Sequence, residues 1–340
     1  MPESLPAFRY PRHWAAPRLN PLSRGMTARS LDWAAEMGLA EHALRGLDAM
    51  GSGLNPGAFA GCIHPHTGNA ELLQISSDFA LWITIMDDAV EHLSPRIKHE
   101  ERAALFADCT RFYQQHLPAP HTVLDPYRRG YTDLGQRLER LVPPDAHPTW
   151  RERFQYELIA CNRSAVMEEP RASAEWKGPE FYEQIRPFTP GVLPFMPLME
   201  IADDCLLPPH VVRDPRLARV EELACVIFGH FNDVASLDKD DRKGEPVPNI
   251  VLMHQHAHRG TVAESVAAVA RRHNTLVGQL RHRIAELVAN HPHDAELVQR
   301  YTRSVQNLVT GIAYWHLHAL RYGERFRSRA RLEHGRALVR

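Results

Sequence analysis

The chain has 340 residues, of which 44% are apolar and 24% are charged, an ordinary composition for a globular protein with a sizeable core. Its formal net charge of −1 at pH 7 argues against nucleic acid as the main partner. No run of about 18 apolar residues exists to span a membrane, and no signal peptide is expected. The five cysteines lack metal-like spacing and indicate thiols in a reducing compartment, so we expect a cytoplasmic protein.

Apolar residues at helical spacing predict helices along most of the chain. Residues 1–28 hold five prolines and are expected to form an irregular arm, and the Gly-, Pro- and His-rich stretch 51–68 is expected to be a loop. The predicted helices begin at Thr27 and then cover 69–92, 95–117, 127–141, 149–169, 178–186, 197–205, 221–241, 262–290 and 294–320. Alternating runs bounded by hairpin turns are absent, so we predict an all-α fold. No repeat or linker divides it, which favours a single domain over 29–326 with a tail over 327–340.

The helix over 69–92 becomes apolar almost all round and then ends in acidic residues. Asp87, Asp88 and Glu91 follow the apolar run directly. Carboxylates are rarely buried unless they are paired or bind a metal, and acidic side chains at a helix C-terminus oppose the helix dipole. The alternative is a helix end that reaches solvent, whereas a bound cation would explain all three acids.

A second polar group lies on the helix over 221–241. Asn232, Ser236 and Asp240 recur every four residues, so an amide oxygen, a hydroxyl and a carboxylate share one helix face. All three are hard oxygen donors of the kind that Mg²⁺ accepts, and Lys239 adds a cation beside them. The alternative is a solvated helix end with scattered polar residues.

Together, Asp-Asp-x-x-Glu and Asn-Asp-x-x-Ser-x-x-x-Asp resemble the two metal-binding motifs of the class I terpene synthases of the bacterial type. The family usually has Glu at the last position, where this chain has Asp240, which is shorter by one methylene but keeps the ligand type. Arg186 stands 46 residues before Asn232, at the place of the family's diphosphate-sensing Arg.

The resemblance continues near the C-terminus and covers residues from about 17 to 326. Arg321 and Tyr322 match the family's Arg-Tyr pair, with Trp315 six residues before the Arg. Lys239 matches a Lys that contacts the diphosphate in that family.

The segment 186–194 predicts a helix that is broken inside the domain. Pro187 and Pro190 lack backbone N–H groups, Thr189 precedes a proline, and Gly191 permits an unusual turn. The resemblance implies that this break links the sensing Arg to ionisation, with Thr189 as the linker and Pro190 as the effector residue. The alternative is a plain loop.

An enzyme that ionises a prenyl diphosphate needs cations for the diphosphate and a dry, aromatic pocket for the carbocation. Phe79, Trp82 and Trp315 are the candidates we select for substrate contact, and simple core packing is the alternative for each. Other candidate aromatics are Phe188, Phe195, Phe231 and Tyr314.

Some polar clusters are expected to be unrelated to this chemistry. Asp203-Asp204 lacks a third acid and is interpreted as a surface pair. His254, His256 and His258 are interpreted as solvated helix or loop histidines rather than zinc ligands.

The resemblance implies a helical bundle around an apolar cavity and a carbon–oxygen lyase that cyclises a linear prenyl diphosphate with three Mg²⁺ ions. Farnesyl diphosphate and a sesquiterpene product are expected, with a diterpene or monoterpene cyclase as the alternative. A prenyl chain-elongating synthase and a non-catalytic all-α metal- or phosphate-binding protein are the rivals. A homodimer is a further expectation from the family. The expected metal ligands are Asp87, Asp88, Glu91, Asn232, Ser236 and Asp240, and the expected diphosphate ligands are Arg186, Lys239, Arg321 and Tyr322.

Overall fold

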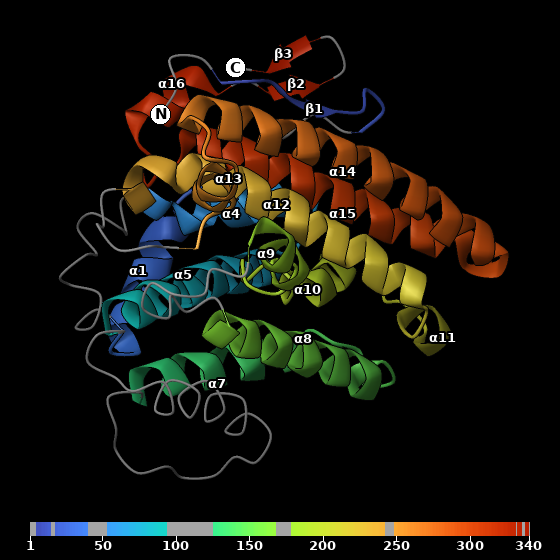
Figure 1. The fold of residues 1–340 in the computed structure, drawn as a ribbon. Coiled ribbons are helices and arrows are strands. Elements are labelled where there is room, and N and C mark those ends of the chain that lie inside the picture. Colours follow the sequence, from blue (N-terminus) through green and yellow to red (C-terminus); the bar gives the residue numbers. More distant parts are fainter. Residues whose placement is uncertain are drawn as a thin grey trace.

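Three long helices from the C-terminal half form the framework of the molecule. In the computed structural model, α12 (Pro215–Asp241), α14 (Val262–Asn290) and α15 (Ala295–His318) lie side by side (Figure 1). α5 (Ala70–Leu93) lies beneath them, and α4 (Pro56–Ile63) packs between α5 and α15. The structure describes residues 5–14, 18–39, 53–93, 125–167, 178–241, 248–330, 332–334 and 337–339.

The shorter helices cover the two faces of this framework. Figure 1 shows α7 and α8 below α5, on the side away from α14. The remaining helices are α1 (Met26–Glu36), α7 (Asp125–Glu139), α8 (His147–Met167), α9 (Pro179–Ile185), α10 (Phe195–Ala202), α11 (Pro209–Val212), α13 (Ile250–His258) and α16 (Glu324–Arg329), with 3-10 turns η1 (Pro21–Ser23) and η2 (Pro292–Asp294). The all-α prediction is confirmed, and the predicted helices that fall in the described residues are present. The helix predicted over 95–117 lies outside those residues.

The expectation of a loop over 51–68 was wrong, because α4 occupies its centre. Asn55 caps this helix by accepting a hydrogen bond from the Ala58 backbone N–H at 3.2 Å, and Pro56 occupies the first turn. Both are helix start signals, which the Gly and Pro content of the stretch concealed. Seven of its eight residues are buried, so α4 is part of the core.

A small sheet, which the sequence did not predict, connects the N-terminal arm to the C-terminal tail. β1 (Phe8–Tyr10) pairs in parallel with β2 (Leu332–His334), and β2 pairs antiparallel with β3 (Ala337–Val339). Each strand has three residues, too few for an alternating pattern to be recognised. The arm over 1–28 is therefore not wholly irregular, and Phe8 anchors it by packing on Phe231 with ring centroids 4.7 Å apart.

A buried ionic cluster connects four helices on the side of the core near α8. Arg153 of α8 donates to Glu157 at 2.9 Å, to Glu200 of α10 and to Glu221 of α12, and its guanidinium lies 3.0 Å from the hydroxyl of Tyr301 on α15. Burial raises the pKa of both Glu157 and Glu221. Burial thus outweighs the stabilising effect of the single guanidinium on these two carboxylate charges.

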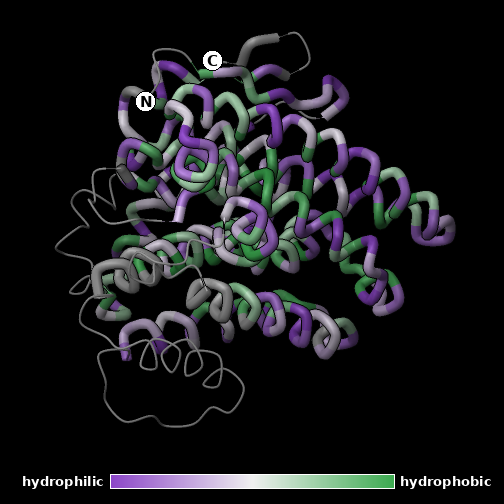
Figure 2. Tube along the Cα trace, in the orientation of Figure 1, coloured by the Kyte–Doolittle hydropathy of each residue, from purple (hydrophilic) through white to green (hydrophobic). Residues whose placement is uncertain are grey.

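Apolar residues fill the space between the helices. Figure 2 shows hydrophobic residues concentrated on the inner helices such as α5 and α10, and hydrophilic residues along outer turns of α14. Within the described part of the chain, no helix combines the length and apolar character needed to cross a membrane.

α15 crosses α4 at close range because Gly311 has no side chain. A Cβ atom at this position would overlap the carbonyl oxygen of Cys62 on α4. Backbone atoms cannot move aside as the end of a side chain can, so this crossing requires glycine.

We predict that Gly311→Ala destabilises the protein by about 1–3 kcal/mol, because the new methyl group forces α15 away from α4. Gly278→Ala on α14 is the matched control, since a Cβ there meets nothing within 4 Å. The control should be neutral or stabilising by about 0.5–1 kcal/mol. Urea unfolding of both variants measures the difference, and equal effects would contradict the close crossing.

Candidate active site

The second predicted motif lies on one face of α12, as its spacing indicates. The hydroxyl of Ser236 lies 2.9 Å from both the Asn232 carbonyl oxygen and Asp240 Oδ2. The amide oxygen, hydroxyl and carboxylate therefore occur on successive turns of one helix. These are hard oxygen donors, and their chemistry fits a divalent cation such as Mg²⁺.

Asn249, which the sequence analysis did not select, fixes the far end of this motif. Its Nδ2 donates to Asp240 Oδ2 at 3.0 Å and to the Asp233 carbonyl oxygen at 2.8 Å. Its Oδ1 accepts from the Val251 backbone N–H at 2.9 Å and so caps α13. An Asn directly before an apolar helix is a recognisable cap signal, but the contact with Asp240 joins two separate elements and has no spacing rule.

Arg186 and Asp233 form a buried ion pair beside Asn232. Arg186 Nη2 donates to Asp233 Oδ1 at 2.5 Å and lies 3.3 Å from Asn232 Oδ1. The other oxygen of Asp233 accepts from the Ile250 backbone N–H at 3.0 Å. The guanidinium also lies over the ring of Tyr182, 5.4 Å from its centroid. The Arg predicted from its distance in sequence thus lies next to the motif, and the pair connects α9, α12 and the start of α13.

The side-chain amide of Asn232 is held in one orientation by two aromatic residues. Its Nδ2 donates to Tyr322 Oη at 3.0 Å and to His316 Nε2 at 3.1 Å. His316 Nδ1 lies 2.8 Å from the Ile312 carbonyl oxygen, which can only accept, so Nδ1 carries the proton and Nε2 accepts. Burial lowers the pKa of His316 to about 3, which keeps the ring neutral. With both amide hydrogens engaged, Oδ1 of Asn232 must face Arg186.

The turn after α15 brings the C-terminal Arg-Tyr pair to the same place. The Arg321 backbone N–H donates to the Gly53 carbonyl oxygen at 2.9 Å, and Trp315 Nε1 donates to the Leu54 carbonyl oxygen at 3.0 Å. Tyr322 packs against His316 in a tilted arrangement, with ring centroids 4.5 Å apart. The segment before α4 therefore sets the position of Arg321 and Tyr322.

The predicted helix break is present between α9 and α10. Gly191 has a φ of +68°, and a Cβ there would lie 2.7 Å from Ile83 Cδ1, so both the backbone and the space favour glycine. Arg186 Nη1 donates to Thr189 Oγ1 at 3.0 Å, which connects the Arg to the break. Pro190 follows within the same turn. The linker and effector roles of Thr189 and Pro190 stay predictions.

Asp87, Asp88 and Glu91 lie in the last two turns of α5. Their side chains, and that of Lys239, are outside the part of the molecule that the structure describes. The expectation that the two acidic motifs face each other therefore stays a prediction.

Four of the candidate aromatics, Phe79, Trp82, Phe195 and Trp315, belong to a continuous chain of rings in the core. Phe79 lies 5.9 Å from Trp82 and 4.9 Å from Phe195, measured between ring centroids. Phe59 continues the chain at 5.2 Å from both Phe195 and Trp315. Trp82 also donates its indole N–H to the Tyr127 carbonyl oxygen, which fixes it between α5 and α7. Phe231, by contrast, packs on the N-terminal arm.

Two polar clusters lie outside the motif, one beside α10 and one on α13. Calling Asp203-Asp204 a surface pair was wrong for Asp203, which is half-buried and accepts a hydrogen bond from the Ser304 hydroxyl. Burial accordingly raises the pKa of Asp203. His254 and His258 pack ring to ring on α13, with centroids 4.3 Å apart, and His258 is exposed.

The all-α fold, the Asn-Asp-x-x-Ser-x-x-x-Asp helix and the adjoining Arg186 and Tyr322 define a class I terpene synthase. The family model described as terpene synthase family 2, C-terminal metal binding, matches residues 78–279, and the chain belongs to this family. It is therefore a terpene cyclase whose matched domain is a metal-binding one.

Three individual proteins show how similar the relatives are to this chain. Isoafricanol synthase of Streptomyces malaysiensis is 28% identical over 282 residues, which cover 78% of this chain and 70% of that protein. A Roseiflexus castenholzii protein named (+)-T-muurolol synthase ((2E,6E)-farnesyl diphosphate cyclizing) is 25% identical over 240 residues, 70% of each chain. The fold matches that of germacradien-4-ol synthase from Streptomyces citricolor with a TM-score of 0.72 at 21% identity, covering 94% of this chain and 100% of that one.

We predict that His316→Phe lowers cyclase activity by about 10–100-fold, because Asn232 loses an acceptor that orients its amide. His318→Phe is the matched control: His318 makes the same kind of backbone contact, to the Tyr314 carbonyl oxygen at 2.8 Å, but is exposed. Steady-state rates at several Mg²⁺ concentrations measure the effect. An equal loss in the two variants would contradict the orienting role of His316.

Proposed function

We propose that this protein ionises a linear prenyl diphosphate in a Mg²⁺-dependent reaction, cyclises the resulting allylic cation and releases diphosphate. The observation that carries the proposal is the contact of Asn232 with both Arg186 and Tyr322, at 3.3 and 3.0 Å. A metal-ligand type of side chain, a guanidinium and a phenol from three separate segments meet at one point. That combination suits an anion held jointly by cations and hydrogen-bond donors.

Farnesyl diphosphate is the proposed substrate and a sesquiterpene the proposed product. The name of the Roseiflexus relative, which includes farnesyl diphosphate cyclisation, supports this chain length. Geranyl and geranylgeranyl diphosphate are the alternatives within the same class.

Asp87, Asp88 and Glu91 on α5, together with Asn232, Ser236 and Asp240 on α12, would hold the metal ions. Bound Mg²⁺ would supply Lewis-acid stabilisation of the departing diphosphate, and the family resemblance supports three ions. Arg186, Lys239, Arg321 and Tyr322 would bind the diphosphate oxygens and stabilise the charge that develops there.

Arg186 would also transmit substrate binding to the helix break. Its guanidinium donates to Asp233 through Nη2 and to Thr189 through Nη1. A diphosphate that accepts a hydrogen bond from the guanidinium would therefore change the hydrogen bonding of Thr189. Pro190 is the next residue along the chain. In this proposal, the backbone of Pro190 is aligned with the reacting carbon of the substrate only when the diphosphate is bound.

The ring chain formed by Phe79, Trp82, Phe195, Phe59 and Trp315 would face or support the hydrocarbon part of the substrate. All five side chains are buried, so water is excluded from them, and a carbocation among such rings gains about 1–2 kcal/mol per face. Water exclusion is essential because an allylic cation reacts with water faster than it can cyclise.

The family resemblance also supports a homodimer in the reducing environment of the cytoplasm.

Incubation of the purified protein with Mg²⁺ and, separately, geranyl, farnesyl and geranylgeranyl diphosphate tests the proposal. We expect diphosphate release and a cyclic C15 product by gas chromatography–mass spectrometry, with farnesyl diphosphate as the best substrate. A longer linear prenyl diphosphate formed with isopentenyl diphosphate would identify a chain-elongating synthase instead. Diphosphate release in none of the three incubations would identify a non-catalytic protein.

We predict that Asp87→Ala and Asn232→Ala each lower diphosphate release by at least about 100-fold, because each removes a ligand of the metal–diphosphate complex. Glu222→Ala on α12 is the control, since Glu222 pairs with Arg219 at the surface and lies away from the motif. Circular dichroism should show the same helical content in all three variants. Unchanged turnover in either motif variant would overturn the proposed site.

A further inference from the structure

Away from the candidate active site, four side chains that can bind metals gather at the other end of the long helices. His210 lies on α11, and Asp214 directly precedes α12. His291 follows the end of α14, and Asp294 lies in η2. Asp214 is separated from Asn232 by about 27 Å along α12, at 1.5 Å per residue, so this cluster cannot share ligands with the diphosphate site.

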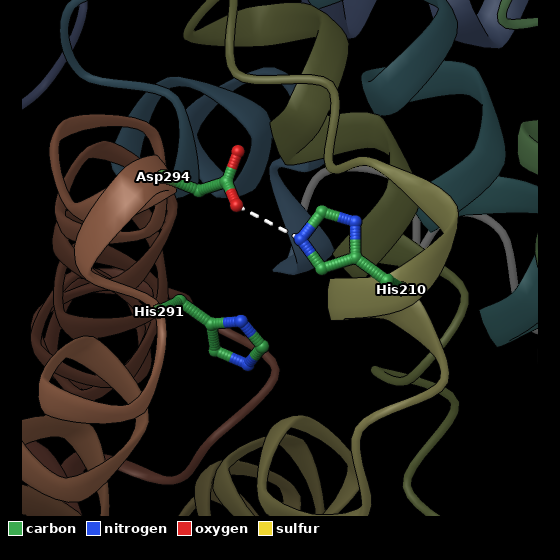
Figure 3. Close-up of side chains that lie close together, drawn as sticks. All are labelled: His210, His291 and Asp294. Atoms are coloured by element: carbon green, nitrogen blue, oxygen red, sulfur yellow. Dashed lines mark hydrogen bonds and ion pairs between the residues drawn. The ribbon is translucent and has the colours of Figure 1, made fainter.

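Three of the four residues converge on one point. One ligand atom from each of His210, His291 and Asp294 can be chosen so that all three lie within 4.8 Å of one another. His210 Nε2 and Asp294 Oδ2 are already 2.8 Å apart. Figure 3 shows both imidazole rings turned toward the Asp294 carboxylate from opposite elements, His210 from α11 and His291 from the α14–α15 junction.

Asp214 holds His291 in the form that a metal requires. His291 Nε2 lies 2.7 Å from Asp214 Oδ2, and the side chains of the two residues are only 11% and 7% exposed. Asp214 Oδ1 accepts from the Arg216 backbone N–H at 2.8 Å, which fixes the carboxylate itself. Because the carboxylate accepts, Nε2 carries the proton and Nδ1 keeps its lone pair, and Figure 3 shows one ring nitrogen of His291 turned toward His210 and Asp294. A carboxylate behind a histidine is the usual outer support of a metal ligand.

We propose that His210, His291 and Asp294 form a binding site for a divalent transition metal of the zinc type. Two imidazole nitrogens and one carboxylate oxygen suit Zn²⁺, Co²⁺ or Ni²⁺, whereas Mg²⁺ prefers oxygen ligands alone. Water would complete a tetrahedron.

A bound metal would set the spacing of the three ligand atoms. With metal–ligand bonds of about 2.0–2.2 Å, tetrahedral geometry sets ligand atoms about 3.4 Å apart. That value lies between the 2.8 Å that separates His210 Nε2 from Asp294 Oδ2 and the 4.8 Å within which all three ligand atoms lie. His210 has a side chain that is 62% exposed, so its ring can turn without disturbing the core. Its proton would move from Nε2 to Nδ1, and the neutral ring would then bind through Nε2.

Such a metal would connect two elements that are far apart in the sequence. α11 has four residues and stands between α10 and α12, whereas His291 and Asp294 belong to the turn between α14 and α15. The metal would fasten α11 to that turn. This inference goes beyond the proposed function, and its consequence is thermal stability rather than turnover.

The test uses the full chain, freed of metals with a chelator and then titrated with Zn²⁺ alone in buffer that contains Mg²⁺. We expect one Zn²⁺ per chain to bind, by isothermal titration calorimetry, and the melting midpoint to rise by about 4 °C at a hundredfold excess over Kd. Co²⁺ in place of Zn²⁺ should give the visible absorption of a tetrahedral complex.

His210→Ala and Asp294→Asn should each remove this one binding event and the rise in melting midpoint. His293→Ala is the matched control, because His293 is an exposed histidine in the same 3-10 turn but outside the cluster, and it should respond as the unchanged protein does. Zn²⁺ binding and stabilisation that survive in both cluster variants would overturn the proposal. So would the absence of Zn²⁺ binding by the unchanged chain, which would leave two ordinary His–Asp pairs.

Discussion

The buried contact between Arg186 and Asp233 is the interaction on which the rest of the site depends. Each charge is largely shielded from water, and removing either partner would leave the other uncompensated, so neither side chain is free to move independently. Asp233 uses its second oxygen to accept from the backbone at the start of α13, while Arg186 ends α9. One carboxylate on α12 therefore fixes how α9 and α13 sit against it.

Asn232, next to Asp233 on α12, is the residue of the proposed site whose direction depends on this ion pair. Asn232 and Asp233 are consecutive on a helix and so point about 100° apart. Asp233 faces α9 and α13, whereas Asn232 faces the junction of Arg186 with the C-terminal turn, where Tyr322 and His316 receive its amide hydrogens. Because the ion pair sets the rotation of α12, it also sets the direction of Asn232. Structural and chemical roles are thus divided between two adjacent residues.

Periodicity explains which parts of this arrangement could be predicted. Residues four apart on a helix share a face, so the alignment of Asn232, Ser236 and Asp240 followed from the sequence, and the resemblance to a family placed Arg186 beside them. Asn249 and His316 were missed because their contacts join separate elements, where no spacing rule applies. α4 and the three short strands were missed for a local reason, since Gly and Pro concealed the helix and three residues cannot show alternation.

Arg186 links these static contacts to the proposed reaction. A guanidinium has five donors in a fixed plane, so Arg186 can keep Asp233 while its remaining donors serve Thr189 or an incoming phosphate oxygen. The ion pair holds the guanidinium in place, so a phosphate oxygen would meet donors that are already positioned beside Thr189. Gly191 lies at the other end of the same turn, with a positive φ and Ile83 against it, so the turn has little freedom to relax in other directions. In the proposed mechanism, a change in the partner of Arg186 would therefore be passed to Thr189 and Pro190.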